Sequence, residues 1–205
     1  MVVPSPPAGA SAAPAVDVVV AGAAGRMGSR IVACLHETDD LRLVAALEAP
    51  GHGALGRDAG EVAGVGALGV AVQGDAGAVI GRGRVLVEFS TPEATLEHLR
   101  LVADAGGRAV IGTTGFTAAQ REAIGSLARR APIVLSPNMS VGVNLAFRLL
   151  QTMAATLGEE YDVEITEIHH RFKKDAPSGT ALRMAEVVAE ALGRDLGHVA
   201  VYGRQ

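Results

Sequence analysis

Residues 169–180 read His-His-Arg-Phe-Lys-Lys-Asp-Ala-Pro-Ser-Gly-Thr and bring two imidazoles, three cationic side chains and two hydroxyls into twelve positions. Lys173 and Lys174 are the only lysines in the 205-residue chain, so apart from the histidines every other basic residue is an arginine. A guanidinium keeps its proton at any working pH, whereas an ammonium can give one up when its pKa is lowered. The stretch therefore predicts a site that needs a proton donor.

A helix is expected to begin at the end of this stretch. Residues 175–177 end the preceding strand or loop, and Ser178-Gly179-Thr180 opens an apolar run with helical period. One face of that helix is formed by Ala181, Met184, Ala185, Val188 and Leu192. The free N–H groups and positive dipole end of such a helix favour an anion, most simply a substrate carboxylate. The alternative is a solvated charged surface with an ordinary Ser or Thr cap.

The segment before the two histidines alternates in polarity. Tyr161, Val163 and Ile165 fall on one face, with acidic residues and Thr166 on the other, which predicts a strand over 161–168. Neighbours on a strand point to opposite sides. His169 and His170 can therefore serve one site only if the strand has ended by then.

A glycine loop lies near the start of the chain. The β-branched run 16–21 passes into Gly22-Ala23-Ala24-Gly25-Arg26-Met27-Gly28, and a helix is expected from Met27 to His36. The three glycines suit a tight turn, close approach of backbone to a pyrophosphate, and close packing of helix on strand. The spacing is GxxGxxG rather than GxGxxG, and in a chain with 26 glycines it is weak evidence by itself.

An acidic residue follows at the expected distance. A second strand is predicted over 41–47, and it ends in Glu48, whose carboxylate can accept hydrogen bonds from ribose hydroxyls. Ala49 follows, so no arginine stands beside Glu48 to hold a 2′-phosphate. NADH is therefore favoured over NADPH, although Arg26 or Arg57 could reach a phosphate.

Strands and helices then alternate after a long Gly/Ala-rich loop at 51–68. Strands are predicted at 69–72, 84–89, 108–111 and 133–135, and helices at 93–105, 118–130 and 141–157. This order predicts an α/β fold, with a Rossmann-type doubly wound parallel sheet over residues 16–140 and a partial substrate domain of α+β type over 141–205. Loops rich in Gly, Ser, Thr and Asn follow three strands, at 89–92, 112–115 and 136–140, where ligands of such sheets bind.

Composition excludes several classes of function. The net charge of −4 and the absence of a basic stripe exclude a nucleic-acid surface. Residues 1–15 predict a disordered tail rather than a signal peptide, and no apolar run is long enough to span a membrane, so a cytoplasmic location is expected. No metal-ligand spacing is present, and Cys34 is expected to be a buried small residue within the first helix.

Taken together, these motifs resemble one family, the 4-hydroxy-tetrahydrodipicolinate (dihydrodipicolinate) reductases of the diaminopimelate route to lysine. The resemblance runs from Val16 to the C-terminus. It rests on the segments 22–28, 45–48, 110–116, 138–144 and 167–180, and the last of these is highly specific.

The resemblance implies hydride transfer from NADH or NADPH to a small cyclic dicarboxylate with loss of water. It implies that His169 is a proton donor and acceptor, that Lys173 is a proton donor, and that His170, Gly179 and Thr180 contact the substrate carboxylates. It implies cofactor contacts from Gly22, Ala23, Ala24, Gly25, Arg26, Met27, Glu48, Gly112, Thr113, Thr114, Ser136, Pro137, Asn138 and Met139.

The family also implies a homotetramer, formed through further C-terminal strands that are expected to lie beyond Gln205. Two other hypotheses stay open. One is a non-catalytic module that binds a nicotinamide nucleotide, and the other is a different Rossmann dehydrogenase acting through a thiol, against which the place of Cys34 counts.

Overall fold

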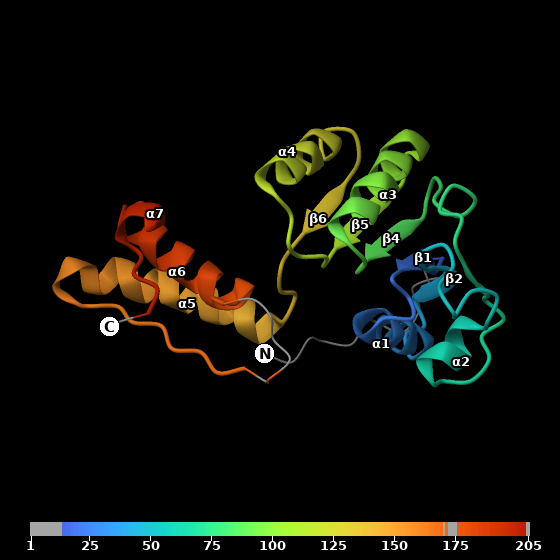
Figure 1. Ribbon diagram of the computed structural model, residues 1–205, viewed down its shortest axis with the longest axis horizontal. Helices are drawn as coiled ribbons and strands as arrows, with labels where there is room; N and C mark the ends of the chain where they lie inside the picture. Colours follow the sequence, from blue (N-terminus) through green and yellow to red (C-terminus); the bar gives the residue numbers. More distant parts are fainter. Residues whose placement is uncertain (1–13, 170, 172–175, 204–205) are drawn as a thin grey trace, which may run out of the picture. The chain divides into compact units, whose positions relative to one another are not determined.

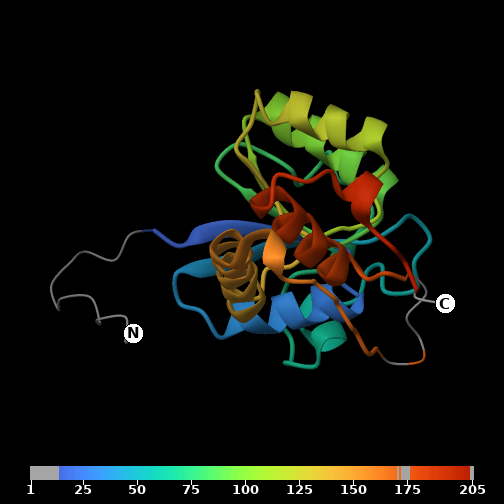
Figure 2. The ribbon, with the colours of Figure 1, turned by 90° about the vertical axis from the view of Figure 1, so that its left-hand side faces the viewer.

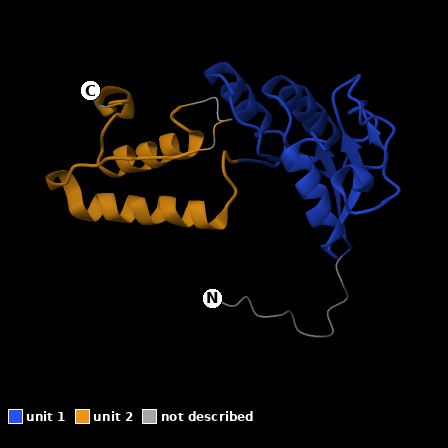
Figure 3. Cartoon of the chain, turned by 60° about the horizontal axis from the view of Figure 1, so that its bottom comes forward, with its two compact units in different colours: residues 1–135 blue, residues 136–205 orange. Residues whose placement is uncertain are grey.

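The computed structural model describes residues 14–169, 171 and 176–203. The chain forms two compact units, residues 1–135 and 136–205, which are coloured separately in Figure 3.

The first unit contains a parallel sheet. Its strands are β1 (Val16–Ala21), β2 (Leu41–Leu47), β3 (Val72–Gln73), β4 (Val85–Glu88), β5 (Arg108–Ile111) and β6 (Ile133–Leu135). Their order across the sheet is β3-β2-β1-β4-β5-β6, and every neighbouring pair is parallel. This is the doubly wound order of dinucleotide-binding folds, in which the direction of winding reverses between β1 and β4.

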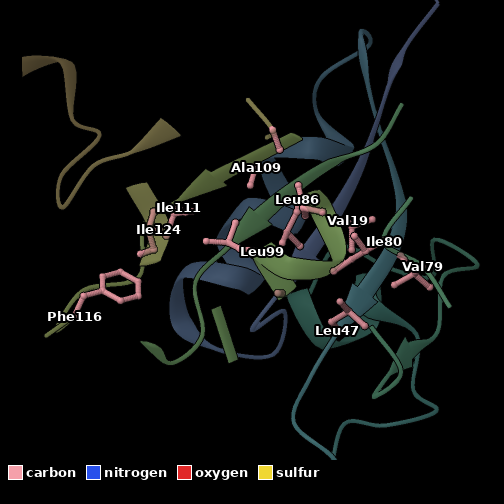
Figure 4. Packing of buried hydrophobic residues seen from close by; sticks show 14 residues of the cluster. Val19, Leu47, Val79, Ile80, Leu86, Leu99, Ala109, Ile111, Phe116 and Ile124 are labelled. Carbon is pink, nitrogen blue, oxygen red and sulfur yellow. The ribbon is translucent and has the colours of Figure 1, made fainter. Parts of the chain in front are cut away.

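Helices cover both faces of the sheet (Figures 1 and 2). On one face lie α1 (Arg26–His36) and α2 (Ala59–Ala63), and on the other lie α3 (Pro92–Ala105) and α4 (Ala118–Leu127). The buried strand residues alternate between two clusters, one under each pair of helices. Figure 4 shows the larger cluster, in which Leu99 of α3 and Ile124 of α4 pack on Leu86 and Ile111 of the sheet.

Among the described residues of the second unit, the regular secondary structure is helical. It consists of α5 (Val141–Leu157), the 3₁₀ turn η1 (Gly158–Glu160), α6 (Gly179–Ala191) and α7 (Leu196–Val199), and α5 packs along α6. The strand predicted over 161–168 does not form: this segment is exposed, and none of its described residues belongs to a ladder. Alternating polarity suits a strand, but a ladder also needs a hydrogen-bonding neighbour.

Other expectations of the sequence also differ from the structure, among them the strand predicted at 69–72, which is observed only as Val72–Gln73. The loop predicted at 51–68 contains the short helix α2, which Asp58 caps by accepting from the N–H groups of Gly60 and Glu61. Cys34 was expected to be buried, but it lies on the exposed side of α1. The described residues include no helix long and apolar enough to cross a membrane.

Candidate functional site

The glycine loop between β1 and α1 requires glycine at two of its three positions. Gly22 has φ of 73°, and a Cβ there would lie 2.3 Å from the carbonyl oxygen of Phe89, which follows β4. A Cβ on Gly28 would lie 2.0 Å from the carbonyl oxygen of Gly22. Both clashes are with backbone, which cannot swing aside, so the first glycine fits the loop against β4 and the third packs α1 onto the loop.

The start of α1 offers backbone donors to a ligand. Gly25 is the N-cap residue and, lacking a side chain, cannot satisfy the first N–H groups of the helix. Arg26 and Met27 are exposed beside it. A helix N-terminus of this kind favours a phosphate, so the backbone here fits the pyrophosphate of a dinucleotide.

Glu48 lies at the same end of the sheet, just after β2. Its Oε1 accepts from the N–H of Ala24 in the glycine loop at 2.8 Å, and its Oε2 accepts from the N–H of Ala49 at 3.2 Å. Each carboxylate oxygen has a second acceptor position, so both can still bind hydroxyls. The carboxylate is thereby held against the loop, where a negative charge suits a ribose diol better than a 2′-phosphate.

The loop after β5 is packed against the loop after β4. A Cβ on Gly112 would lie 2.0 Å from the ring of Phe89, so the glycine leaves room for that ring. The side chain of Thr113 is buried, and its hydroxyl accepts from Ser90 N–H at 3.2 Å and bonds Thr95 Oγ1 at 3.1 Å. The side chain of Thr113 therefore holds the loop in place, whereas Thr114 is exposed.

A buried acid anchors these loops, and sequence analysis did not single it out. Glu88, the last residue of β4, is fully buried; its Oε1 accepts from the N–H and hydroxyl of Ser90, and its Oε2 lies 2.7 Å from His98 Nδ1. Burying a carboxylate costs free energy unless hydrogen bonds compensate for the lost water, and these partners supply them. The available signal was an acidic residue at the end of an otherwise apolar strand.

In the second unit, the loop after β6 is joined to the start of α6. Asn138 donates from Nδ2 to Thr180 Oγ1 at 3.3 Å, and its Oδ1 accepts from the N–H of Ser140 at 2.9 Å. Ser136 donates to the carbonyl oxygen of Asn138 at 2.7 Å. Pro137 and Met139 are exposed beside it. The structure thus brings a residue predicted to line the cofactor next to one predicted to bind the substrate.

α6 begins where the sequence predicts a helix, and Ser178 is its N-cap residue. Ser178 is 2% exposed, and its hydroxyl accepts from the N–H of Ala181 at 3.0 Å. Gly179 is exposed at the first position of the helix. His169 Nδ1 lies 3.3 Å from Glu167 Oε2, a partner that sequence analysis missed. His170 and Lys173 lie outside the described residues.

The structure also bears on the thiol hypothesis. Cys34 borders an apolar hollow together with Val16 and Val18, at the amino-terminal part of β1. The glycine loop, Glu48 and Phe89 all follow the carboxyl ends of strands, where ligands of such sheets bind. Cys34 is therefore misplaced for catalysis. Among the described residues, no group of three or more His, Cys, Asp or Glu side chains could hold a metal ion.

The doubly wound sheet, the tight glycine loop and the acid after β2 define an α/β protein of the dinucleotide-binding class. Two family models match the chain: "Dihydrodipicolinate reductase, N-terminus" over residues 16–139 and "Dihydrodipicolinate reductase, C-terminus" over residues 142–202. The chain belongs to the dihydrodipicolinate reductase family, a family of oxidoreductases.

Individual relatives agree with this assignment. The chain is 52% identical to the 4-hydroxy-tetrahydrodipicolinate reductase of Citrifermentans bemidjiense over 190 residues, which cover 93% of this chain and 71% of the relative. It is 53% identical to the enzyme of that name from Magnetococcus marinus, with the same coverage. Among solved structures, the dipicolinate-bound dihydrodipicolinate reductase from Paenisporosarcina sp. TG-14 is similar, with a TM-score of 0.69, 30% identity, and coverage of 93% of this chain and 72% of that one.

Proposed function

We propose that this chain reduces 4-hydroxy-tetrahydrodipicolinate to tetrahydrodipicolinate, in the route to diaminopimelate and lysine in the cytoplasm. The bound nicotinamide nucleotide would supply a hydride to C4 of the substrate, whose hydroxyl leaves as water. The observation that carries the proposal is the match of both halves of the chain to the two reductase family models.

The first unit has the features that a nucleotide needs. Backbone from Gly22 to Met27 would hold the pyrophosphate at the start of α1, where the glycines leave no Cβ in the way. Glu48 would accept from the ribose hydroxyls. A 2′-phosphate would instead meet this carboxylate, which supports NADH over NADPH as the preferred cofactor.

Residues between 169 and 180 would bind the substrate and transfer protons to and from it. Gly179 and Thr180, at the start of α6, would donate to a carboxylate, joined by His170. His169 would exchange a proton with the reacting substrate, and Lys173 would donate one to the departing hydroxyl or to the intermediate. Gly112 to Thr114 and Ser136 to Met139 would border the nicotinamide. A homotetramer, as the family resemblance implies, is part of this proposal.

The test is a direct assay of the 205-residue chain. NADH oxidation is followed by its near-ultraviolet absorbance with enzymatically generated 4-hydroxy-tetrahydrodipicolinate, beside a titration of NADH binding without substrate. We expect oxidation that depends on substrate and a lower KM for NADH than for NADPH. NADH binding without any turnover would contradict the proposal and favour a non-catalytic nucleotide-binding module.

A further inference from the structure

The carboxylate of Glu167 contacts two different elements of the second unit. Its Oε1 accepts from the backbone N–H of Ser178 at 2.7 Å, and its Oε2 lies 3.3 Å from Nδ1 of His169. Glu167 and His169 are two residues apart in an exposed segment outside any helix, a spacing that puts side chains of extended chain on the same side. One side chain thus reaches both the proposed acid–base histidine and the turn that opens α6.

The contact with Ser178 fixes the place of this carboxylate. Ser178 is almost completely buried, and its hydroxyl caps α6 while its N–H bonds Glu167. A hydrogen bond from a backbone N–H to a charged acceptor is among the stronger kinds in proteins. This bond therefore anchors Glu167 to Ser178, which lies eleven residues further along the chain and immediately before Gly179 and Thr180.

The contact with His169 selects one form of the imidazole ring. An ionised carboxylate can only accept hydrogen bonds, so a ring nitrogen that lies 3.3 Å from it is favoured in its protonated form. In the neutral ring, Nδ1 is then protonated and Nε2 has the free lone pair. The group that one ring nitrogen faces thus decides which nitrogen carries the hydrogen, and Nε2 is left as the atom that can take up and return a proton.

We propose that Glu167 is a positioning residue that holds His169 with Nδ1 protonated and Nε2 available for proton exchange, and that ties this ring to the substrate-binding turn at the start of α6. This inference rests on the proposed function for the role of His169 in turnover. The choice of ring form rests on geometry alone, so it can be tested without any reaction.

The variant Glu167→Gln separates the two contacts. The N–H of Ser178 needs an oxygen acceptor, so the amide oxygen is expected to keep that bond. The amide NH₂ then faces Nδ1 of His169 and can only donate, which requires Nδ1 to give up its hydrogen. Glu167→Gln should therefore preserve the turn and move the hydrogen of the neutral His169 ring from Nδ1 to Nε2.

The measurement is the ¹⁵N spectrum of the histidine rings in the uniformly labelled chain, at a pH high enough for the neutral form. His169→Gln identifies the signals of His169. His98 is an internal reference because its Nδ1 lies 2.7 Å from Glu88, a pair that the variant leaves alone. Asp162→Asn is the matched control, since it removes one carboxylate from the same exposed segment.

We expect His169 to carry its hydrogen on Nδ1 in the native chain and in Asp162→Asn, and on Nε2 in Glu167→Gln. A native ring protonated mainly on Nε2, or a ring that Glu167→Gln does not change, would overturn the inference. Failure of the native chain to turn over substrate would contradict the proposed function and leave this spectrum as the independent test.

Kinetics supply the second readout. Glu167→Gln should lower kcat by about tenfold to a hundredfold, within the range that general acid–base catalysis contributes, with the KM for NADH unchanged. Asp162→Asn should match the native chain. If Glu167→Gln moves the hydrogen to Nε2 but leaves kcat unchanged, the positioning role is overturned. A loss of NADH affinity as large as the loss of kcat would indicate a general structural defect instead.

Discussion

The side-chain amide of Asn138 donates to the hydroxyl of Thr180 at 3.3 Å and joins the loop after β6 to the first turn of α6. These residues are 42 positions apart in the sequence, and motif analysis assigned them to different ligands. The same amide accepts from Ser140 N–H through Oδ1, so its orientation is fixed by a second bond. The loop proposed for the nicotinamide is thus coupled to the turn proposed for the substrate carboxylate.

We expect this coupling to appear as non-additivity in the KM for the dicarboxylate substrate. Thr180→Val removes the hydroxyl at nearly constant volume, and Asn138→Ala removes its donor. Asn138→Ala should raise the KM several-fold in the native background but add little to Thr180→Val, which corresponds to a coupling energy of about 0.5–1.5 kcal/mol. Independent, additive effects would show that the bond does not support substrate binding.

Gly28→Ala should damage the nucleotide loop. Its Cβ would lie 2.0 Å from the carbonyl oxygen of Gly22, so α1 or the loop must shift. We expect NADH affinity to fall at least about tenfold, since each 1.4 kcal/mol of lost contact gives that factor. Calorimetric titration with NADH measures it.

The matched control for this variant is Gly125→Ala, within α4, where a Cβ meets no atom within 4 Å. Alanine at an exposed helical site should stabilise the chain by about 0.5–1 kcal/mol, with NADH binding unchanged. Equal NADH affinities in the two variants would mean that close packing at Gly28 is not needed by the nucleotide site.

Glu48→Ala should weaken NADH binding far more than it changes the KM for substrate. Hydrogen bonds to a charged group contribute about 1.5–3 kcal/mol, which corresponds to roughly tenfold to a hundredfold in the dissociation constant. Loss of the carboxylate also removes the acceptor for Ala24 N–H in the glycine loop. Unchanged NADH affinity in this variant would exclude Glu48 from ribose binding.

The parts of the fold with strong periodicity were predictable from the sequence. The observed bounds of β1, β2, β5, β6 and α5 coincide with those expected, because apolar runs between turn residues define them. The segment 161–168 was not predictable in the same way, because alternation specifies the faces of a strand and not the presence of a neighbour. Cys34 shows a related limit: a small apolar residue in an amphipathic helix can lie on either side.

The contacts that hold the site together could not be predicted from the sequence either. The motifs identified His169 and Thr180 as candidate site residues. Their partners Glu167 and Asn138 could not be identified in this way, because these contacts depend on the folded conformation of the chain. Thr113 is another example. The family resemblance implies a cofactor contact for it, and the structure adds what the sequence did not indicate, that its hydroxyl bonds within the buried network around Glu88.

Lys173→Ala should lower kcat by on the order of a hundredfold or more, with NADH binding intact, because general acid catalysis contributes about 10²–10⁴-fold. This prediction rests on the sequence, since Lys173 lies outside the described residues. Lys173→Arg is the informative companion: it keeps the positive charge but cannot readily release a proton. Rescue of turnover by arginine would indicate that charge, rather than proton donation, is what position 173 supplies.

Asp58 should make the stability of the first unit depend on pH in acid. Its carboxylate accepts from the N–H groups of Gly60, Glu61, Leu68 and Gly69, and the bond from Leu68 is the largest cause that lowers the pKa of Asp58 below its ordinary value of 3.8. The folded chain therefore keeps this group ionised at a pH where the unfolded chain binds a proton. Its stabilising effect is complete above the ordinary value and is lost as pH falls through the lowered pKa of the folded state.

Asp58→Asn keeps an amide oxygen but does not titrate. The free energy of unfolding of the native chain should exceed that of the variant near neutral pH, and the difference should shrink as pH falls below about 4. Urea denaturation at a series of pH values measures this difference. Asp75→Asn is the control, because Asp75 accepts a single N–H, from Ala78 at 3.3 Å. A difference for Asp58→Asn that stays constant across this range would show that the four backbone donors do not favour the ionised carboxylate.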